Sequence, residues 1–187
     1  NEREGNSCHI HFSLRDYEND EPVAWGDGPG HTSPVMASAM AGLLATMREF
    51  TLLYAPNINS YKRYAVGSFA PTAVRWGTDN RTCSLRLVGH GPPSMRVENR
   101  VPGADVNPYL AVAGLVAGAL HGIENDLTLE DEYVGNAYVD ETAPHVPATL
   151  RDALALWEGS EIARNAFGED VVAHYANNAK VELAAFD

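Results

Sequence analysis

Residues 95–123 read MRVENRVPGADVNPYLAVAGLVAGALHGI and join a strand pattern to a helix pattern in one stretch. From 95 to 101, charged residues alternate with mainly apolar ones, which is the period of a half-buried strand. Asn107 followed by Pro108 is a favourable N-cap and first-turn pair, so the apolar run towards Ile123 is predicted to be a helix. This unit predicts an α+β fold in which an antiparallel sheet is backed by helices.

Two other segments, 8–14 (CHIHFSL) and 82–88 (TCSLRLV), alternate in the same way. Each of the three predicted strands has a mainly apolar face and a face of charged or ligand-type side chains. The second kind of face carries His9, His11 and Ser13; Thr82, Ser84 and Arg86; and Arg96, Glu98 and Arg100. A solvated face would favour Lys, Glu and Thr over His and Arg, so three such faces together favour a functional surface.

Imidazole, carboxylate and guanidinium groups suit a site for a metal ion and phosphate. Imidazole and carboxylate can bind Mg²⁺ or Mn²⁺, and guanidinium groups bind phosphate or carboxylate oxygens in pairs. Phosphoryl transfer requires mainly positioning and charge neutralisation, which these groups supply. One histidine and one glutamate are too few for a metal site, so we expect further ligands upstream of Asn1.

The remaining segments extend the α+β pattern without a repeat or an evident linker. A loop is predicted over 16–34, a buried helix over 35–54 and another loop over 57–63. Two or three helices are predicted in 148–185, with breaks at Gly159 and Gly168.

The chain has 187 residues, 45% of them hydrophobic, and a formal net charge of −12. This length suits a single domain. The negative charge argues against a nucleic-acid partner, and no apolar run reaches the roughly 18 residues of a membrane span. Residues 62–100 nevertheless hold seven Lys and Arg residues against two acidic ones. This basic centre predicts an internal site for a small polyanion.

Cys8 and Cys83, the two cysteines, fall at apolar strand positions. They predict two free thiols rather than a disulfide, which suits a reducing, cytoplasmic compartment. Neither thiol has an evident base beside it, so a catalytic cysteine is not favoured.

Four segments together resemble the glutamine synthetase family: GNSCHIHFSL (5–14), NINSYKRYAVGSFAP (57–71), DNRTCSLRL (79–87) and residues 95–123. The tail over 148–186 resembles it more weakly. The resemblance spans nearly the whole chain. It implies the C-terminal portion, over 1–187, of a glutamine synthetase/guanido kinase-like catalytic domain.

The resemblance implies roles for individual positions. Two match ligands of the family's second metal ion, Mg²⁺ or Mn²⁺: His9 and Glu98. Four match contacts to ATP: His11, Ser13, Arg86 and Arg96. Three match contacts to glutamate: Gly5, Arg63 and Arg100. Two are expected to be catalytic arginines: Arg63, which would also bind the α-carboxylate, and Arg81, which would stabilise the transferring phosphoryl group.

Two positions depart from the family pattern. Ammonium-using members read G-Y-E-A-P where this chain reads Gly67-Ser68-Phe69-Ala70-Pro71, and their glutamate binds ammonium and removes a proton. A phenyl ring cannot accept a proton, but it can contact the carbon chain of a larger amine and attract its charge. Glu4 stands where the family has an asparagine near the glutamate amino group.

The resemblance therefore favours the bacterial branch that γ-glutamylates polyamines or ethanolamine, with Phe69 as part of the amine site. The alternatives are an ammonium-using glutamine synthetase and a catalytically silent relative with a structural or regulatory role. Tyr138 falls near the tyrosine that some members adenylylate, although the local match is poor.

The family also implies parts that this chain does not contain. An N-terminal β-grasp domain and most metal-binding glutamates would precede it, and members form homo-oligomeric rings, commonly dodecamers. We therefore expect the 187-residue chain alone to be inactive.

Overall fold

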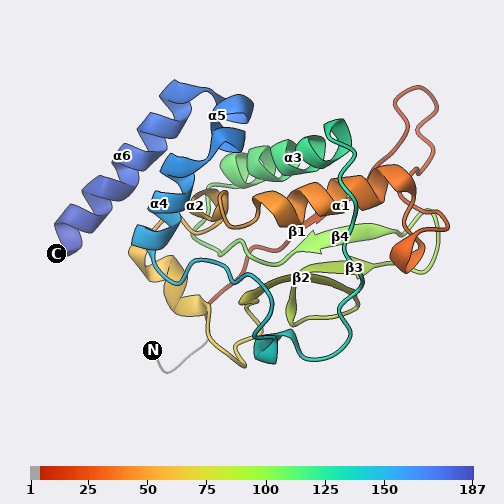
Figure 1. Cartoon of the computed structure of the whole chain (residues 1–187), viewed down its shortest axis with the longest axis horizontal. Coiled ribbons are helices and arrows are strands. Elements are labelled where there is room, and N and C mark those ends of the chain that lie inside the picture. The colour runs from red at the N-terminus through yellow and green to blue at the C-terminus, as the bar shows by residue number, and fades with distance from the viewer. Residues whose placement is uncertain (1–4) are drawn as a thin grey trace.

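The computed structural model describes residues 5–187, so the prediction about Glu4 lies outside the described part. Four strands form one sheet in the order β1-β4-β3-β2 (Figure 1). Their bounds are Ile10–Phe12 (β1), Ala73–Thr78 (β2), Cys83–Val88 (β3) and Arg96–Asn99 (β4). The predicted α+β class is confirmed, and three of these strands lie within the predicted segments.

The sheet is mixed rather than wholly antiparallel, which corrects the prediction. β4 is antiparallel to both β1 and β3, but β2 runs parallel to β3. Parallel neighbours usually need a crossover of about a dozen residues, whereas here only residues 79–82 connect them. Asn80 supports this short link, because its Nδ2 donates to the carbonyls of Tyr133 and Gly135 at 3.3 and 2.9 Å. β2 was not predicted, because four of its six residues are buried and apolar–polar alternation is lost.

Two helices cover the apolar face of the sheet: α1 (Pro34–Thr46) and α3 (Pro108–Glu124). Ser33 and Asn107 cap them through their side chains, and each helix starts with proline. The helices approach very closely at two glycines: a β-carbon on Gly122 would lie 1.9 Å from the Ser38 carbonyl oxygen and 2.6 Å from Gly42 N.

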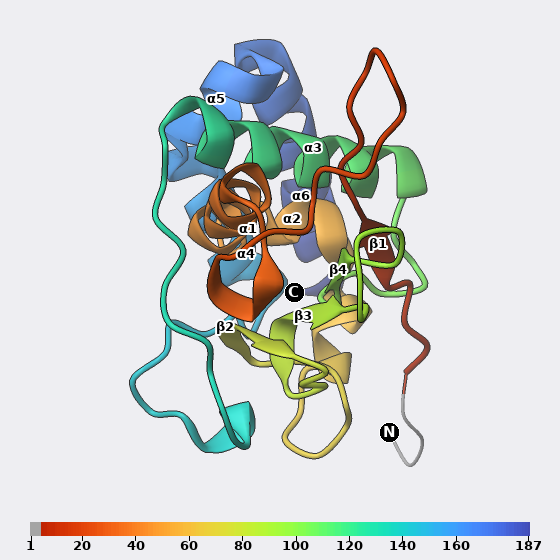
Figure 2. The ribbon, with the colours of Figure 1, turned by 90° about the vertical axis from the view of Figure 1, so that its right-hand side faces the viewer.

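The predicted helix over 35–54 is two helices, because the chain leaves helical geometry between α1 and the short α2 (Thr51–Tyr54). The predicted loop over 57–63 contains a 3-10 helix, η2 (Ile58–Arg63). Two other 3-10 helices occur, η1 (Pro29–His31) and η3 (Ala137–Val139). Figure 2 shows the segment with η3 running down beside the β2 edge of the sheet.

Three helices complete the fold, as predicted: α4 (Leu150–Gly159), α5 (Glu161–Phe167) and α6 (Glu169–Phe186). Trp157 is fully buried and packs edge-on against Phe50, which attaches these helices to the main core. Within residues 5–187, no helix is both long and apolar enough to cross a membrane. Both cysteines are free, as expected, and burial raises the pKa of Cys83 to about 12.

Candidate active site

The register of the sheet brings the predicted polar side chains together. His11 is paired with Glu98 across β1 and β4, and Glu98 is paired with Arg86 across β4 and β3. Paired positions share a face, so these side chains form a row across three strands. Positions two residues away share that face as well: His9, Arg96 and Arg100. The prediction of one chemical face on three strands is therefore confirmed.

The Glu98 carboxylate lies at the centre of this face and is buried, with 4% of the residue exposed. Its Oε1 lies 2.9 Å from His9 Nδ1 and 3.7 Å from His11 Nε2. Its Oε2 accepts hydrogen bonds from Arg100 at 3.0 Å and from Arg86 at 3.4 Å. We call these five residues the Glu98 cluster. Its excess of basic groups suits a polyanion.

Two pKa shifts describe the charge state of the cluster. Burial raises the pKa of Glu98, but hydrogen bonds from His9 and Arg100 outweigh burial and bring that pKa to about 2. Burial also lowers the pKa of His11 below its usual 6.5. The positive charge of Arg96 acts in the same direction, whereas the negative charge of Glu98 acts in the opposite direction. Near neutral pH, Glu98 is therefore ionised and His11 is largely uncharged.

His9 offers a free coordinating nitrogen. Its Nδ1 contacts Glu98, whereas its Nε2 is buried and has no hydrogen-bond partner within residues 5–187. A carboxylate on one ring nitrogen and a free second nitrogen is a common arrangement in metal-binding histidines. No group of three or more His, Cys, Asp or Glu residues in the described chain could hold a metal ion. The residues present fit part of a metal site.

The expected glutamate-binding residues Gly5 and Arg63 lie together near the end of β4. A β-carbon on Gly5 would lie 3.5 Å from Arg63 Cγ, which is ordinary contact distance. The buried Arg63 guanidinium donates to Ser7 Oγ at 3.4 Å and to the Val101 carbonyl, and it lies 5.0 Å from the Tyr64 ring centre. The structure thus brings Gly5 and Arg63 together and fixes the guanidinium.

Phe69 is linked to the Glu98 cluster through its backbone. Its carbonyl accepts a hydrogen bond from Arg100 Nη2 at 3.0 Å, while Nη1 of the same arginine contacts Glu98. Phe69 has a φ of 59°, which is unusual for a bulky residue and costs about 1 kcal/mol or more. Yet 64% of Phe69 is exposed. A buried arginine therefore holds an exposed aromatic residue beside the cluster.

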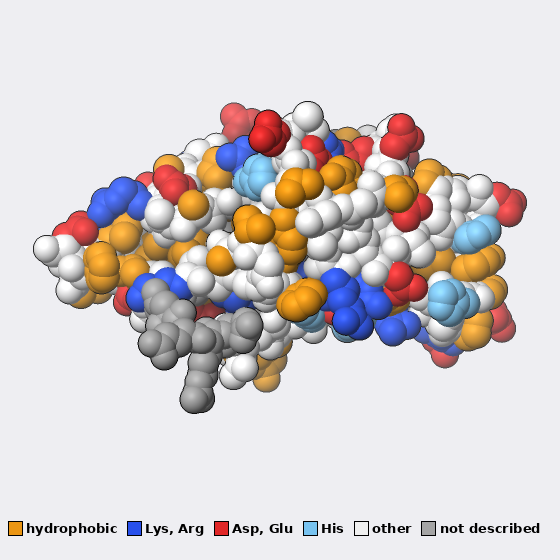
Figure 3. Space-filling view, turned by 90° about the horizontal axis from the view of Figure 1, so that it is seen from below, with side chains coloured by type: hydrophobic (Ala, Val, Ile, Leu, Met, Phe, Trp, Pro, Cys, Tyr) orange, Lys and Arg blue, Asp and Glu red, His pale blue; other side chains and the backbone are white. Residues whose placement is uncertain are grey.

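Ser13 and Arg96 lie towards the turn that joins β3 to β4. Ser13 Oγ donates to the Met95 carbonyl at 2.7 Å. Arg96 Nε donates to His11 Nδ1 at 3.2 Å, and its Nη1 donates to the Ser94 carbonyl at 2.9 Å. Arg96 is thereby oriented next to a predicted ATP contact. The view from below shows Lys and Arg side chains gathered beside histidine and acidic side chains (Figure 3).

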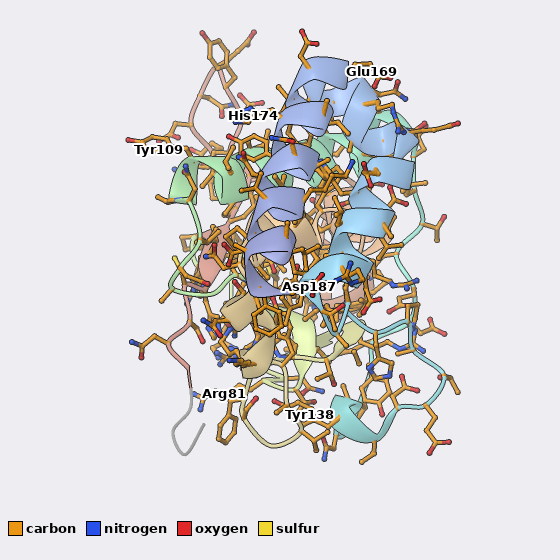
Figure 4. The ribbon with its side chains drawn as sticks, turned by 90° about the vertical axis from the view of Figure 1, so that its left-hand side faces the viewer. Arg81, Tyr109, Tyr138, Glu169, His174 and Asp187 are labelled. Atoms are coloured by element: carbon orange, nitrogen blue, oxygen red, sulfur yellow. The ribbon has the colours of Figure 1, made fainter. Side chains whose placement is uncertain are left out.

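The structure does not connect Arg81 to the cluster by a hydrogen bond. Its side chain is exposed and makes no hydrogen bond or ion pair within the part of the chain that the structure describes. Figure 4 shows Arg81 at the same end of the molecule as Tyr138, away from Glu169 and His174.

Two residues at the site lie outside the strands and helices that the sequence predicts. Asp79 accepts a hydrogen bond from Arg86 Nη2 at 2.8 Å, and Tyr138 Oη donates to the Ala70 carbonyl at 3.0 Å. The sequence pointed to Tyr138 only through a weak likeness to a modification site. In the structure its hydroxyl group is already engaged by the segment that carries Phe69.

Arg75 and four histidines lie apart from the Glu98 cluster. Arg75 binds Asp140 and Glu130, each at 2.8 Å, and Thr142 at 3.2 Å, which ties the η3 segment to β2. The four histidines lie in exposed or partly exposed positions: His90, His121, His145 and His174.

Comparison with known proteins identifies the family of this chain. The family model described as "Glutamine synthetase, catalytic domain" matches residues 1–187. The γ-glutamylethanolamide synthetase GlnA4 of Streptomyces coelicolor is 63% identical over 187 residues, which cover 100% of this chain and 39% of that relative. The glutamate–isopropylamine ligase of a Pseudomonas species is 44% identical over 174 residues, covering 92% of this chain and 38% of the relative.

A third relative, the γ-glutamylputrescine synthetase PuuA of Escherichia coli, is 37% identical over 186 residues. The match covers 100% of this chain and 39% of that relative. A solved structure described as a GmaS/ADP complex has a TM-score of 0.86 at 30% identity, covering 97% of this chain and 43% of that one. The chain spans about two fifths of the length of these curated relatives.

Proposed function

This chain belongs to the glutamine synthetase family, and from that premise we propose that the protein is an ATP-dependent carbon–nitrogen ligase. It would join the side-chain carboxylate of glutamate to an organic primary amine. Phe69, held exposed beside the Glu98 cluster, is the observation that carries the choice of amine. Ethanolamine is the first candidate, because the relative at 63% identity is a γ-glutamylethanolamide synthetase, and polyamines such as putrescine come next.

The proposed reaction has two steps. An oxygen of the glutamate γ-carboxylate attacks the γ-phosphorus of ATP, which forms γ-glutamyl phosphate and releases ADP. The amine nitrogen then attacks the carbonyl carbon of γ-glutamyl phosphate. The C–O bond to phosphate breaks, phosphate leaves, and the nitrogen loses a proton to give the amide.

The residues of the Glu98 cluster suit the first step. Arg86 and Arg96 would bind phosphate oxygens of ATP, with His11 and Ser13 beside them, and Arg81 would stabilise the transferring group. Glu98, with a pKa of about 2, stays ionised and limits repulsion among the basic groups. A divalent ion, Mg²⁺ or Mn²⁺, held by His9, Glu98 and ligands from elsewhere would neutralise phosphate charge.

The Phe69 segment suits the second step. The exposed ring can contact the carbon chain of an amine, and its face attracts a cation before the amine is deprotonated. The ring cannot accept the proton, so the proton must pass to another group. Arg63, Gly5 and Arg100 would hold glutamate, and Arg100 also contacts the Phe69 carbonyl. Glutamate and amine would therefore meet at Arg100.

The direct test is phosphate release by the full-length protein with ATP, Mg²⁺ and glutamate. Ammonium, ethanolamine, putrescine and spermine are supplied separately. We expect release with an organic amine and little with ammonium. A preference for ammonium would identify an ordinary glutamine synthetase, and no release with any amine would favour a silent relative.

Substituting Phe69 tests the origin of the amine preference. Phe69→Glu should restore a carboxylate that binds a small cation, and should shift relative kcat/KM from organic amines towards ammonium by roughly ten-fold or more. Phe69→Leu is the matched control, because it keeps an apolar side chain and should not gain ammonium activity. An unchanged amine preference in Phe69→Glu would remove Phe69 from the explanation.

We also propose that the active protein is a cytoplasmic homo-oligomer, as the family resemblance implies, and that residues 1–187 are inactive alone. The expected inactivity is supported because His9 and Glu98 alone are too few to bind a metal ion, and the described residues contain no group of three or more potential ligands. Phosphate release by the purified 187-residue chain would contradict it.

A further inference from the structure

The segment between Arg63 and Ala70 is held by three side chains. Ser68 Oγ contacts the carbonyls of Arg63 and Ala65 at 2.9 and 2.6 Å and so closes the segment on itself. Arg100 donates to the Phe69 carbonyl at 3.0 Å, and Tyr138 Oη donates to the Ala70 carbonyl at 3.0 Å. Two consecutive carbonyls are thus fixed by side chains from separate parts of the chain.

These anchors do not serve to bury Phe69. The residue is 64% exposed and its φ is 59°, so neither packing nor backbone preference accounts for its conformation. A non-glycine residue keeps such a conformation only where its surroundings enforce it. Arg100 holds the Phe69–Ala70 peptide unit, and Tyr138 holds the next unit, Ala70–Pro71, so the hydrogen bond from Tyr138 restrains the chain immediately after the peptide that carries the Phe69 carbonyl.

Tyr138 is itself firmly supported. Asn136 caps η3 and accepts the Tyr138 backbone N–H at 3.1 Å. Two residues beyond Tyr138, Asp140 is bound by Arg75 at 2.8 Å. The hydroxyl group is therefore presented from a short element that is tied to β2, rather than from a free loop.

Tyr138 also lies within the electrostatic field of the site. Burial raises its pKa, while the positive charges of Arg100 and Arg63 act in the opposite direction. Tyr138 therefore remains a protonated hydrogen-bond donor at neutral pH.

We infer that Tyr138 is a positioning residue for amine specificity, which fixes the Phe69 ring for the carbon chain of the amine by holding the Ala70 carbonyl. This inference rests on the proposed ligase function. The amine concerned is an organic primary amine with an apolar part, since contact with the ring requires carbon. Tyr138 itself acts through the backbone and not on the reacting atoms.

The test is Tyr138→Phe in the full-length protein, which removes the hydroxyl group and keeps the ring. We expect the KM for the amine to rise about five-fold to ten-fold, as for the loss of one hydrogen bond. The KM values for ATP and glutamate, and kcat at saturating amine, should stay within about two-fold. Tyr133→Phe is the matched control, because Tyr133 Oη donates to the Asn136 carbonyl at 3.3 Å in the same segment. It should leave the amine KM unchanged.

Phe69→Ala decides whether Tyr138 acts through Phe69. In a Phe69→Ala background, Tyr138→Phe should raise the amine KM less than two-fold further, because there is no ring left to position. A further five-fold rise, or an unchanged amine KM in Tyr138→Phe alone, would overturn the inference. Equal rises in all three KM values would indicate a general structural role and would also overturn it. If the unsubstituted protein releases no phosphate with any amine, the proposed function fails first.

Discussion

The two faces of the sheet differ in how completely their atoms are satisfied. On the helix-covered face, Leu85, Leu87 and Val97 are at most 1% exposed and belong to one continuous core. On the opposite face, three nitrogens are buried without a hydrogen-bond partner in residues 5–187: His9 Nε2, Arg86 Nε and Arg100 Nε. Buried polar atoms are normally paired. The first face holds one such atom, Asn99 Nδ2, among apolar side chains, whereas the second has two guanidinium nitrogens and a coordinating nitrogen to offer a ligand.

This difference predicts that stability and chemistry respond to different substitutions. Close packing tolerates no added atom where two backbones touch. An exposed functional group beside the opposite face can instead be removed at a small cost in stability. The following substitutions test that separation, in order of decreasing effect on stability.

The largest effect is expected from Gly122→Ala at the contact between α3 and α1. The new β-carbon would lie 1.9 Å from the Ser38 carbonyl oxygen and 2.6 Å from Gly42 N, and both are backbone atoms. The helices must separate, so we expect the free energy of unfolding to fall by about 4 kcal/mol. Urea unfolding of the full-length protein measures this change.

Gly159→Ala is the control for that substitution. Gly159 also lies in a helix, α4, but a β-carbon there would meet nothing within 4 Å. Alanine should therefore be neutral or stabilising by less than about 1 kcal/mol. Similar losses for the two variants would show that the α1–α3 contact is not specially tight.

A smaller effect, which depends on pH, is expected from Glu98. Its pKa is lowered from 4.5 to about 2, so its stabilising contribution is present above about pH 4.5 and is lost as the pH falls through 2. The stability of the unsubstituted protein relative to Glu98→Gln, measured in EDTA, should decline over this range. A difference that does not change between pH 6 and 2.5 would contradict the assignment.

The sequence predicted the elements whose environment repeats with a regular period. Alternation identified β1, β3 and β4, and the capping pair Asn107-Pro108 identified α3. It missed β2, where burial on both sides removes alternation, and with β2 it missed the parallel pairing that makes the sheet mixed. Strand direction depends here on contacts of Asn80 with distant carbonyls, and local pattern does not contain them.

The same limit applies to the candidate site. The strand residues of the Glu98 cluster were predictable, because alternation places them on one face and pairing aligns His11, Glu98 and Arg86. Asp79 and Tyr138 reach the site from a turn and from a short 3-10 helix that the sequence did not predict, so only the folded chain reveals their contacts. The exposed, strained Phe69 was singled out by comparison with the family pattern, and its hydrogen bond to Arg100 became visible only in the structure.

The smallest effect on stability is expected from Arg81→Ala. This substitution tests most directly whether activity can be lost while stability is kept. The side chain is exposed and makes no hydrogen bond or ion pair within residues 5–187, so the urea midpoint should correspond to a change within about 0.5 kcal/mol. If Arg81 stabilises the transferring phosphoryl group, phosphate release should nevertheless fall by roughly 100-fold or more. Lys62→Ala, another exposed basic residue, should change neither quantity. If Arg81→Ala instead lowered stability and left the rate of phosphate release unchanged, Arg81 would be a structural residue and its proposed catalytic role would be wrong.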